Sequence, residues 1–85
     1  MYRIKLLDNA VKDLKKLDKN TAKRITSKIK WLAENLENTK LEALTADFSG
    51  VFKLRVGDYR IIFEIIHDEE LIIIHLIEHR RTIYK

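Results

Sequence analysis

The sequence predicts a small α+β domain in which an antiparallel helical hairpin packs on a mainly antiparallel sheet of about four strands. Residues 52–66 alternate apolar and polar side chains around a Gly-Asp pair, which is typical of two strands joined by a tight turn. Residues 8–36 repeat apolar side chains every three or four positions, as amphipathic helices do. Residues 71–77 are almost all apolar, which predicts a central strand buried on both faces. The length of 85 residues, without a low-complexity linker, predicts one domain over residues 1–85.

The first elements are a short strand and a helix. Residues 2–7 alternate as a strand, with Tyr2, Ile4 and Leu6 on one side. Asp8 is expected to be the N-cap of the helix, because aspartate is favoured at that position. The helix that follows has its apolar positions at Val11, Leu14 and Leu17, with Ala10 beside them.

A second helix follows a break at Asp18-Lys19-Asn20, and Asn20 or Thr21 is expected to cap it. The short connection predicts that the two helices are antiparallel. Trp31 lies off the apolar stripe, where it either covers the following loop or lies at a partner-binding surface. The stripe consists of Ala22, Ile25, Ile29, Leu32 and Leu36. The irregular segment 37–50 is expected to be anchored by Leu41, Leu44 and Phe48.

The predicted strand hairpin has one face that is rich in positive charge. With Gly57 and Asp58 in the turn, Arg55 lies directly across from Arg60, and like charges in that arrangement repel. The other cross-strand pairs are Val56 with Tyr59, Leu54 with Ile61 and Lys53 with Ile62. The core face is then Phe52, Leu54, Val56, Tyr59, Ile61, Phe63 and Ile65. The opposite face carries Lys53, Arg55 and Arg60, either as a site for a phosphate backbone or as a solvated face whose long side chains splay apart.

A second basic region lies on the predicted helices. The formal net charge is +4, and residues 8–30 hold eight basic against three acidic side chains. Lys15, Lys16, Lys19 and Lys23 could contact a polyanion, or they could form an ordinary lysine-rich solvated face.

Composition excludes several other classes of protein. The chain has no cysteine, so disulfides and thiolate metal sites are excluded. His75 and His79 would lie roughly 13 Å apart on an extended strand, so no metal site is expected. The only two glycines form no nucleotide-binding loop, and we expect no cofactor. The longest apolar run is too short to span a bilayer and no signal peptide is apparent, so we expect a cytoplasmic protein without a membrane partner.

The remaining chemistry is a set of cations with an aromatic side chain, which suits metal-free RNA cleavage. In that reaction a ribose 2′-oxygen attacks the neighbouring phosphorus, and guanidinium groups stabilise the phosphorane. A tyrosine can stack on a base to align the attack. Lys53, with its pKa depressed by neighbouring cations, or His79 would be a better proton acceptor than arginine. Alternatively, His79 and Tyr84 are terminal side chains that rest on the sheet edge. The candidate set is Lys53, Arg55, Arg60, His79, Arg80, Arg81 and Tyr84.

These residues resemble a known family. The segments AVKDLKKLDKNTAKRI, LEALTADFSGVFKLRVGDYRIIFEI and HRRTIYK together resemble the RelE/ParE toxin superfamily over essentially the whole chain. The most specific parts are Lys-x-Arg-x-Gly-x-Tyr-Arg, which begins at Lys53, and His-Arg-Arg-x-x-Tyr, which begins at His79.

Resemblance to the RelE branch implies a toxin of a type II toxin–antitoxin system that cleaves mRNA in the ribosomal A site. It implies no metal, and products with a 2′,3′-cyclic phosphate and a 5′-hydroxyl. It also implies that Arg60 and Arg80 stabilise the phosphorane, that Arg80 protonates the leaving oxygen, and that Tyr84 stacks on the mRNA base. Arg55 replaces the lysine of the best-known members, which leaves the proton acceptor as Lys53 or His79.

The resemblance also implies partners and alternatives. A cognate antitoxin encoded by an adjacent gene, with an acidic wrapping segment, would form a hetero-oligomer with the chain. The ParE branch of the same fold instead poisons DNA gyrase without a nuclease site. A third possibility is a degenerate member that only binds nucleic acid or antitoxin.

Overall fold

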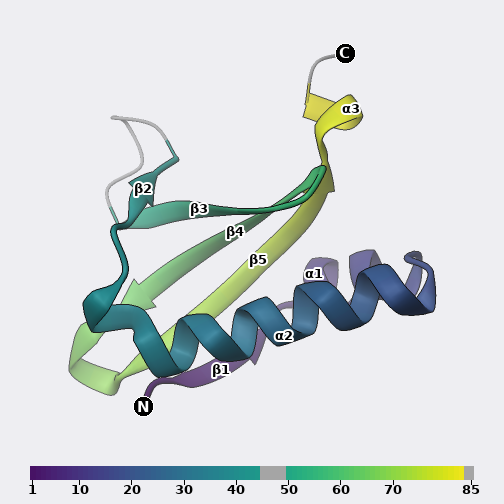
Figure 1. The fold of residues 1–85 in the computed structure, drawn as a ribbon. Coiled ribbons are helices and arrows are strands. Elements are labelled where there is room, and N and C mark those ends of the chain that lie inside the picture. Colours follow the sequence, from purple (N-terminus) through teal and green to yellow (C-terminus); the bar gives the residue numbers. More distant parts are fainter. Residues whose placement is uncertain (45–49, 84–85) are drawn as a thin grey trace.

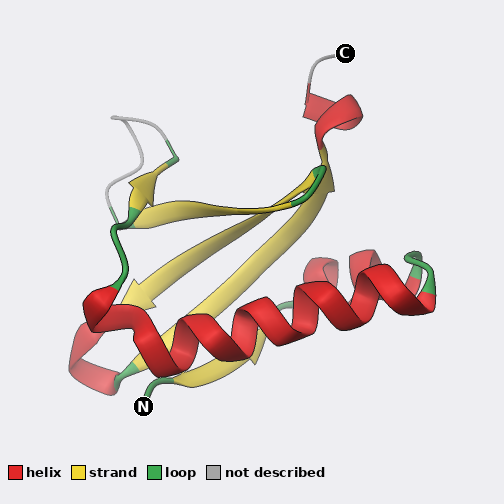
Figure 2. Ribbon diagram, in the orientation of Figure 1, coloured by secondary structure: helices red, strands yellow, loops and turns green. Residues whose placement is uncertain are grey.

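The structure is a computed structural model that describes residues 1–44 and 50–83. Two helices cover one face of a five-stranded sheet, and the described residues leave the other face open (Figures 1 and 2). The strand order is β1-β5-β4-β3-β2, with β1 and β5 parallel and all other neighbours antiparallel. The strands are β1 (Arg3–Leu6), β2 (Glu42–Ala43), β3 (Val51–Val56), β4 (Tyr59–Ile66) and β5 (Leu71–His79). The helices are α1 (Asp8–Lys15), α2 (Lys19–Asn35) and α3 (Arg80–Ile83), with 3-10 turns η1 (Leu36–Asn38) and η2 (His67–Glu69).

This architecture confirms the predicted α+β fold, with one strand more than expected. The additional strand β2 has two residues, which is too short for an alternating pattern to be recognised in the sequence. Leu41 packs against the core as predicted, and the amide of Leu44 donates to the carbonyl of Val51, which extends the ladder between β2 and β3. The third expected anchor, Phe48, lies outside the described residues.

Both helices begin differently from the prediction. Asp8 is the first residue of α1 rather than its N-cap, because the amide of Leu7 still donates to the carbonyl of Ile74 and keeps the preceding residue in extended pairing with β5. Helix α2 is capped by Asp18 and not by Asn20 or Thr21. The side chain and the backbone amide of Thr21 both hydrogen-bond the Asp18 carboxylate, and these bonds lower the pKa of Asp18.

The β3–β4 hairpin has the predicted register. Gly57 and Asp58 form the turn, and Arg55 lies across from Arg60. Of the two turn residues, only Gly57 has a positive φ, of 59°, which glycine adopts without steric cost. The alternate residues Ile61, Phe63 and Ile65 face the helices, whereas Lys53, Arg55 and Arg60 face the other side of the sheet.

A β-bulge interrupts the pairing of β4 with the central strand β5. Ile62 pairs with Leu76, whereas Phe63 pairs with Ile74, so His75 is an extra residue in β5. Close to the bulge, the carboxylate of Asp13 in α1 accepts a 2.9 Å hydrogen bond from the amide of Ile77. This bond ties the first helix to the strand at the point where the register changes.

The core lies between the sheet and the two helices. The predicted stripe of α2 is largely confirmed, since Ile25, Ile29 and Leu32 are buried, and Ala22 is only half-buried. On the hairpin side, Ile61, Phe63 and Ile65 are buried, whereas the apolar side chains of β3 are only partly buried. In the described part of the chain, no helix is long and apolar enough to cross a membrane. The buried core residues are Ala10, Ile25, Ile29, Leu32, Ala33, Leu36, Ile61, Phe63, Ile65, Ile72, Ile74 and Ile77.

Candidate functional site

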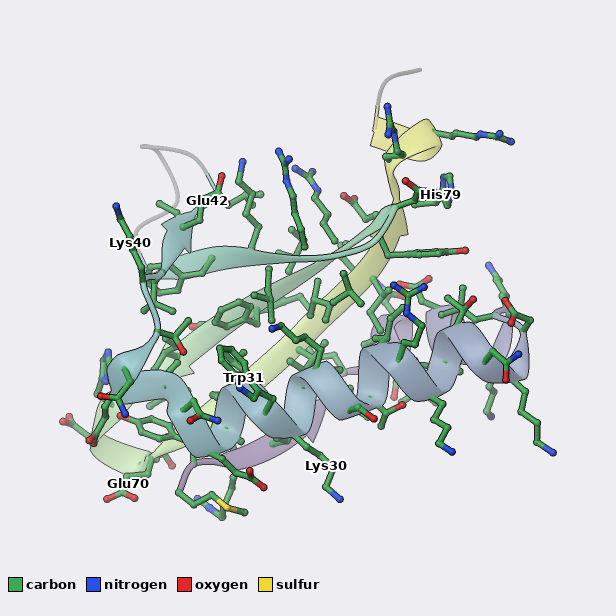
Figure 3. All side chains as sticks on the ribbon, viewed as in Figure 1. Lys30, Trp31, Lys40, Glu42, Glu70 and His79 are labelled. Atoms are coloured by element: carbon green, nitrogen blue, oxygen red, sulfur yellow. The ribbon has the colours of Figure 1, made fainter. Side chains whose placement is uncertain are left out.

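The face of the sheet that is turned away from the helices carries a row of charged side chains, and we call it the open face. Strand residues alternate between the two faces, so the neighbours of the buried residues of β4 and β5 point away from α2. Figure 3 shows Glu42, of the neighbouring strand β2, on the side of the sheet opposite α2. The ionisable residues of the open face that are described below are Glu42, Lys53, Arg55, Arg60, Glu64, His75 and Glu78.

The structure brings Lys53, Arg55 and Arg60 together on this face, as the sequence predicted, and adds carboxylates on either side of them. The Nε of Arg60 donates to Oε2 of Glu78 at 2.7 Å, and the two residues are direct partners across β4 and β5. The Nζ of Lys53 lies 3.4 Å from Oε1 of Glu42, its partner across β2 and β3. The repulsion between Arg55 and Arg60 is therefore reduced by an acidic residue on the next strand. Among the described residues, Arg55 has no ion-pair partner.

These ion pairs differ in strength. The Lys53–Glu42 pair is long, and the side chain of Glu42 is 58% exposed, so solvent weakens it. The Arg60–Glu78 pair is short, and the two side chains are only 25% and 27% exposed. This pair uses only the Nε of the guanidinium, whose terminal amino groups make no hydrogen bond within the described residues. Glu78 thus orients Arg60 and leaves the outer edge of its guanidinium available to an anion.

Arg80 lies at the end of the sheet beside the hairpin turn. Its backbone amide donates to the carbonyl of Asp58 at 2.8 Å, and its Nη1 lies 3.6 Å from Oδ1 of the same residue. The side chain of Arg80 is 67% exposed, so this ion pair is weak. The following residue, Arg81, is also exposed. The turn therefore fixes where α3 begins, and leaves its basic side chains in solvent.

His79 makes contacts of a different kind. Its ring lies edge-on against Tyr59, with the centroids 4.9 Å apart, and Tyr59 packs against the core on the helix side. Its Nδ1 accepts a 3.1 Å hydrogen bond from the amide of Arg81, so the ring proton lies on Nε2. Figure 3 shows His79 at the end of β5, where α3 begins. The structure therefore uses His79 to cap the start of α3, and does not bring it to the cations of the open face.

The other predicted residues are not part of the open face. Lys15, Lys16, Lys19 and Lys23 are exposed where α1 meets α2, and the helices lie on the opposite face of the sheet (Figure 1). The basic side chains of the helices and the cations of the open face therefore form two separate surfaces, and the open face also carries the carboxylates of Glu42, Glu64 and Glu78. Tyr84 lies outside the described residues.

Sequence reasoning missed the acidic members of the open face. Glu42 and Glu78 are far from the hairpin along the chain, and only the pairing of strands places them beside its cations. It also missed a hydrogen-bonded pair in which Nε2 of His75 lies 2.9 Å from Oε1 of Glu64. Within residues 1–44 and 50–83, no three side chains of the metal-binding types lie close enough together to hold a metal ion.

Comparison with known proteins gives consistent matches. Residues 4–84 match the family described as the ParE toxin of the type II toxin–antitoxin system parDE. A putative RelE-like toxin protein of Escherichia coli is 31% identical over 74 residues, which cover 85% of this chain and 75% of that protein.

Solved toxin–antitoxin complexes show the same fold. The complex RelBE2 of Mycobacterium tuberculosis matches with a TM-score of 0.81 and 22% identity, over 93% of this chain and 98% of that one. The RelB–RelE complex of Methanococcus jannaschii matches with a TM-score of 0.74 and 30% identity, over 94% of each chain. On the strength of the family match and the E. coli relative, the chain belongs to the RelE/ParE superfamily of type II toxin–antitoxin toxins.

Proposed function

We propose that this toxin is a metal-independent endoribonuclease that cleaves mRNA in the ribosomal A site and so stops translation. The observation that carries the proposal is the cluster of Lys53, Arg55 and Arg60 on neighbouring strands of the open face. The strands hold the two guanidinium charges and the amine of Lys53 at fixed positions before any ligand binds. Such a preorganised arrangement suits the extra negative charge that develops on phosphorus during transesterification.

In the proposed reaction, the 2′-oxygen of a ribose attacks the adjacent phosphorus and the bond to the 5′-oxygen of the next nucleotide breaks. Lys53 in its neutral form accepts the proton of the 2′-hydroxyl. Arg55 and the outer edge of the Arg60 guanidinium stabilise the phosphorane, and Arg80 protonates the leaving 5′-oxygen. The products carry a 2′,3′-cyclic phosphate and a 5′-hydroxyl. Tyr84 remains the predicted stacking partner for the mRNA base.

The ion pairs of Lys53, Arg60 and Arg80 are compatible with this reaction because two of the three can be exchanged. Glu42 lies 3.4 Å from Lys53 and Asp58 lies 3.6 Å from Arg80, and both carboxylate side chains are more than half exposed. Ion pairs with a solvent-exposed partner are typically worth only about 0–1 kcal/mol. An RNA phosphate can therefore replace each carboxylate at little cost. Glu78 stays in place and continues to orient Arg60.

The partner that we propose for the free toxin is an antitoxin encoded by an adjacent gene. Both solved complexes reported above contain an antitoxin bound to a toxin of this fold. A hetero-oligomer in which the antitoxin covers the basic surfaces would keep the toxin inactive.

A second candidate function is the poisoning of DNA gyrase without RNA cleavage. Two observations favour it: the family match is to ParE, and Lys53, Arg60 and Arg80 each have a carboxylate partner inside the molecule. A chain that no longer cleaves RNA would tolerate such partners, and a chain that only binds antitoxin or nucleic acid would also tolerate them.

Two assays on the purified toxin separate these functions. In the first, the toxin is incubated with ribosomes that carry a defined mRNA, and the 5′ ends of the mRNA are mapped. In the second, gyrase and supercoiled DNA are incubated with the toxin and scored for double-strand breaks. New 5′ ends in the A-site codon, with no gyrase-dependent breaks, support the proposal. Gyrase-dependent breaks with intact mRNA support the second function and overturn the first.

A further inference from the structure

A pocket of about 640 Å³ opens between α2 and the end of β3, on the helix side of the sheet. It lies beyond the edge of the core, where the apolar side chains of β3 are only partly buried. Its walls are mostly apolar, and no carboxylate lines it within the described residues. The residues that shape it include Lys23, Arg24, Ser27, Lys28, Trp31 and Val56.

Trp31 forms one wall of this pocket. It is 40% exposed, and it is one of three large apolar residues exposed in the described part of the chain. Figure 3 shows Trp31 between α2 and the sheet, whereas Lys30 points away from the sheet. The Nζ of Lys28 lies 3.8 Å from the centroid of the Trp31 ring, a cation–π contact that holds a positive charge beside the apolar wall.

Arg24 adds a second fixed cation at the far side of the pocket. A Cβ placed on Gly57 would lie 3.1 Å from Nη2 of Arg24, so the guanidinium rests directly on the hairpin turn. The absence of a side chain at Gly57 leaves room for this contact. Together with Lys23, the two cations surround an apolar hollow with positive charge.

From this arrangement we infer that the pocket binds an acidic peptide segment, one large apolar side chain of which enters the hollow while flanking carboxylates pair with Lys28 and Arg24. Charge complementarity selects this occupant, because every charged residue that lines the pocket is basic. A nucleic acid fits less well, since Lys28 already covers a face of the indole on which a base would have to stack. The segment belongs to the antitoxin, so this inference rests on the partner proposed above and does not depend on RNA cleavage.

Trp31 is the only tryptophan of the chain, so its fluorescence reports on this pocket alone. A random-peptide library without tryptophan or tyrosine is selected on the immobilised full chain. The enriched peptides are then titrated while the emission of Trp31 and its quenching by acrylamide are followed. We expect net acidic peptides with one large apolar side chain, which shift the emission to shorter wavelength and protect Trp31 from quenching.

Variants test whether the binding takes place in the pocket. Labelled peptides should lose about tenfold or more in affinity with Trp31→Ala, because a central apolar anchor is removed. Lys28→Glu should weaken binding about three- to tenfold. Lys30→Glu is the matched control, since it makes the same charge change on the same helix outside the pocket, and it should bind within about twofold of the wild type.

The inference is overturned if no acidic peptide is enriched, or if the enriched peptides leave the emission of Trp31 unchanged. It is also overturned if Lys28→Glu and Lys30→Glu weaken binding equally, or if a uridine oligonucleotide shifts the Trp31 emission in place of the peptides. The mRNA assay is read separately. A toxin that binds acidic peptides at Trp31 and cuts no mRNA would disprove the nuclease and leave this inference standing.

Discussion

Nε of Arg60 donates a 2.7 Å hydrogen bond to Oε2 of Glu78, and the bulge between β4 and β5 is what makes the two residues partners. If the pairing of Phe63 with Ile74 continued without a bulge, Arg60 would lie across from Ile77 and Glu78 would point to the helix side. The extra residue in β5 shifts the register by one. This shift places a carboxylate beside Arg60, whose side chain is only 25% exposed.

The first prediction concerns the charge of Glu78. Glu78→Gln keeps an acceptor for the Nε of Arg60 and removes the negative charge that competes with a phosphate. We expect single-stranded RNA to bind more tightly. The slope of the logarithm of the association constant against the logarithm of the salt concentration should be steeper by about 0.7, the value for one additional phosphate contact. Fluorescence anisotropy of a labelled uridine oligonucleotide over a series of salt concentrations measures this slope.

Glu64→Gln is the matched control for that experiment. It removes a carboxylate from the same face, but one that contacts His75 and no cation of the hairpin. Its salt dependence should equal that of the wild type. Equal slopes for Glu78→Gln and the wild type would show that Glu78 does not compete with RNA for Arg60.

The second prediction concerns the bulge itself. Asp13→Ala leaves the amide of Ile77 without its acceptor in a buried part of the strand, which should cost about 1–3 kcal/mol of unfolding free energy. The Asp13→Asn variant retains an acceptor oxygen, so its free energy of unfolding should fall by less. Urea unfolding measures both variants, and equal losses for the two would contradict a role for the hydrogen bond.

The sequence predicts the hairpin and its cations well because their register is set by a local turn. Gly57-Asp58 and the alternation around it are enough to place Arg55 across from Arg60. The carboxylate partners could not be predicted in the same way, because Glu78 reaches Arg60 only through a bulge that no local pattern signals. Glu42 likewise reaches Lys53 through a two-residue strand.

The helices, too, can be predicted from the sequence only in part. The apolar stripe of α2 follows from spacing alone, but the choice of cap among Asp18, Asn20 and Thr21 depends on where the helical backbone begins. The same spacing places Trp31 off the stripe. That it forms a pocket with the end of β3 depends on how far α2 lies from the hairpin, which no sequence pattern records.

The third prediction concerns His79. This residue caps α3 and contacts Tyr59, and asparagine is also a good helix cap. The His79→Asn variant should therefore cleave mRNA at a rate within about tenfold of the wild-type rate. If His79 were the proton acceptor of the reaction, its removal would instead lower the cleavage rate about 100- to 10,000-fold. Single-turnover cleavage on programmed ribosomes separates the two, and a loss in the larger range would return His79 to the catalytic set.

The fourth prediction concerns the pH dependence of stability. Hydrogen bonds from the side chain and the amide of Thr21 lower the pKa of Asp18 in the folded state. The stability that this carboxylate contributes is therefore present above its ordinary pKa, and is lost as the pH falls through the lowered folded value. Asp18→Ala should lower the Tm by a few degrees at neutral pH, and the difference from the wild type should shrink in acid.

Asp8→Ala is the control for this measurement. Asp8 lies in the first turn of α1 and is not its N-cap, so its removal should lower the Tm less at neutral pH. Thermal unfolding followed by circular dichroism at several pH values compares the three proteins. A difference between Asp18→Ala and the wild type that stays constant with pH would contradict the linkage.

We propose that the cations of the open face stabilise a reacting phosphate, and the cleavage kinetics of the Arg60→Ala variant test this role. The measurement is the single-turnover rate of mRNA cleavage on programmed ribosomes, with Lys5→Ala, an exposed cation on the edge strand β1, as the control. We expect the Arg60→Ala variant to cleave mRNA about 100- to 1,000-fold more slowly and the Lys5→Ala variant to cleave it at the wild-type rate. Equal rates for Arg60→Ala and the wild type, with both proteins folded, would contradict it.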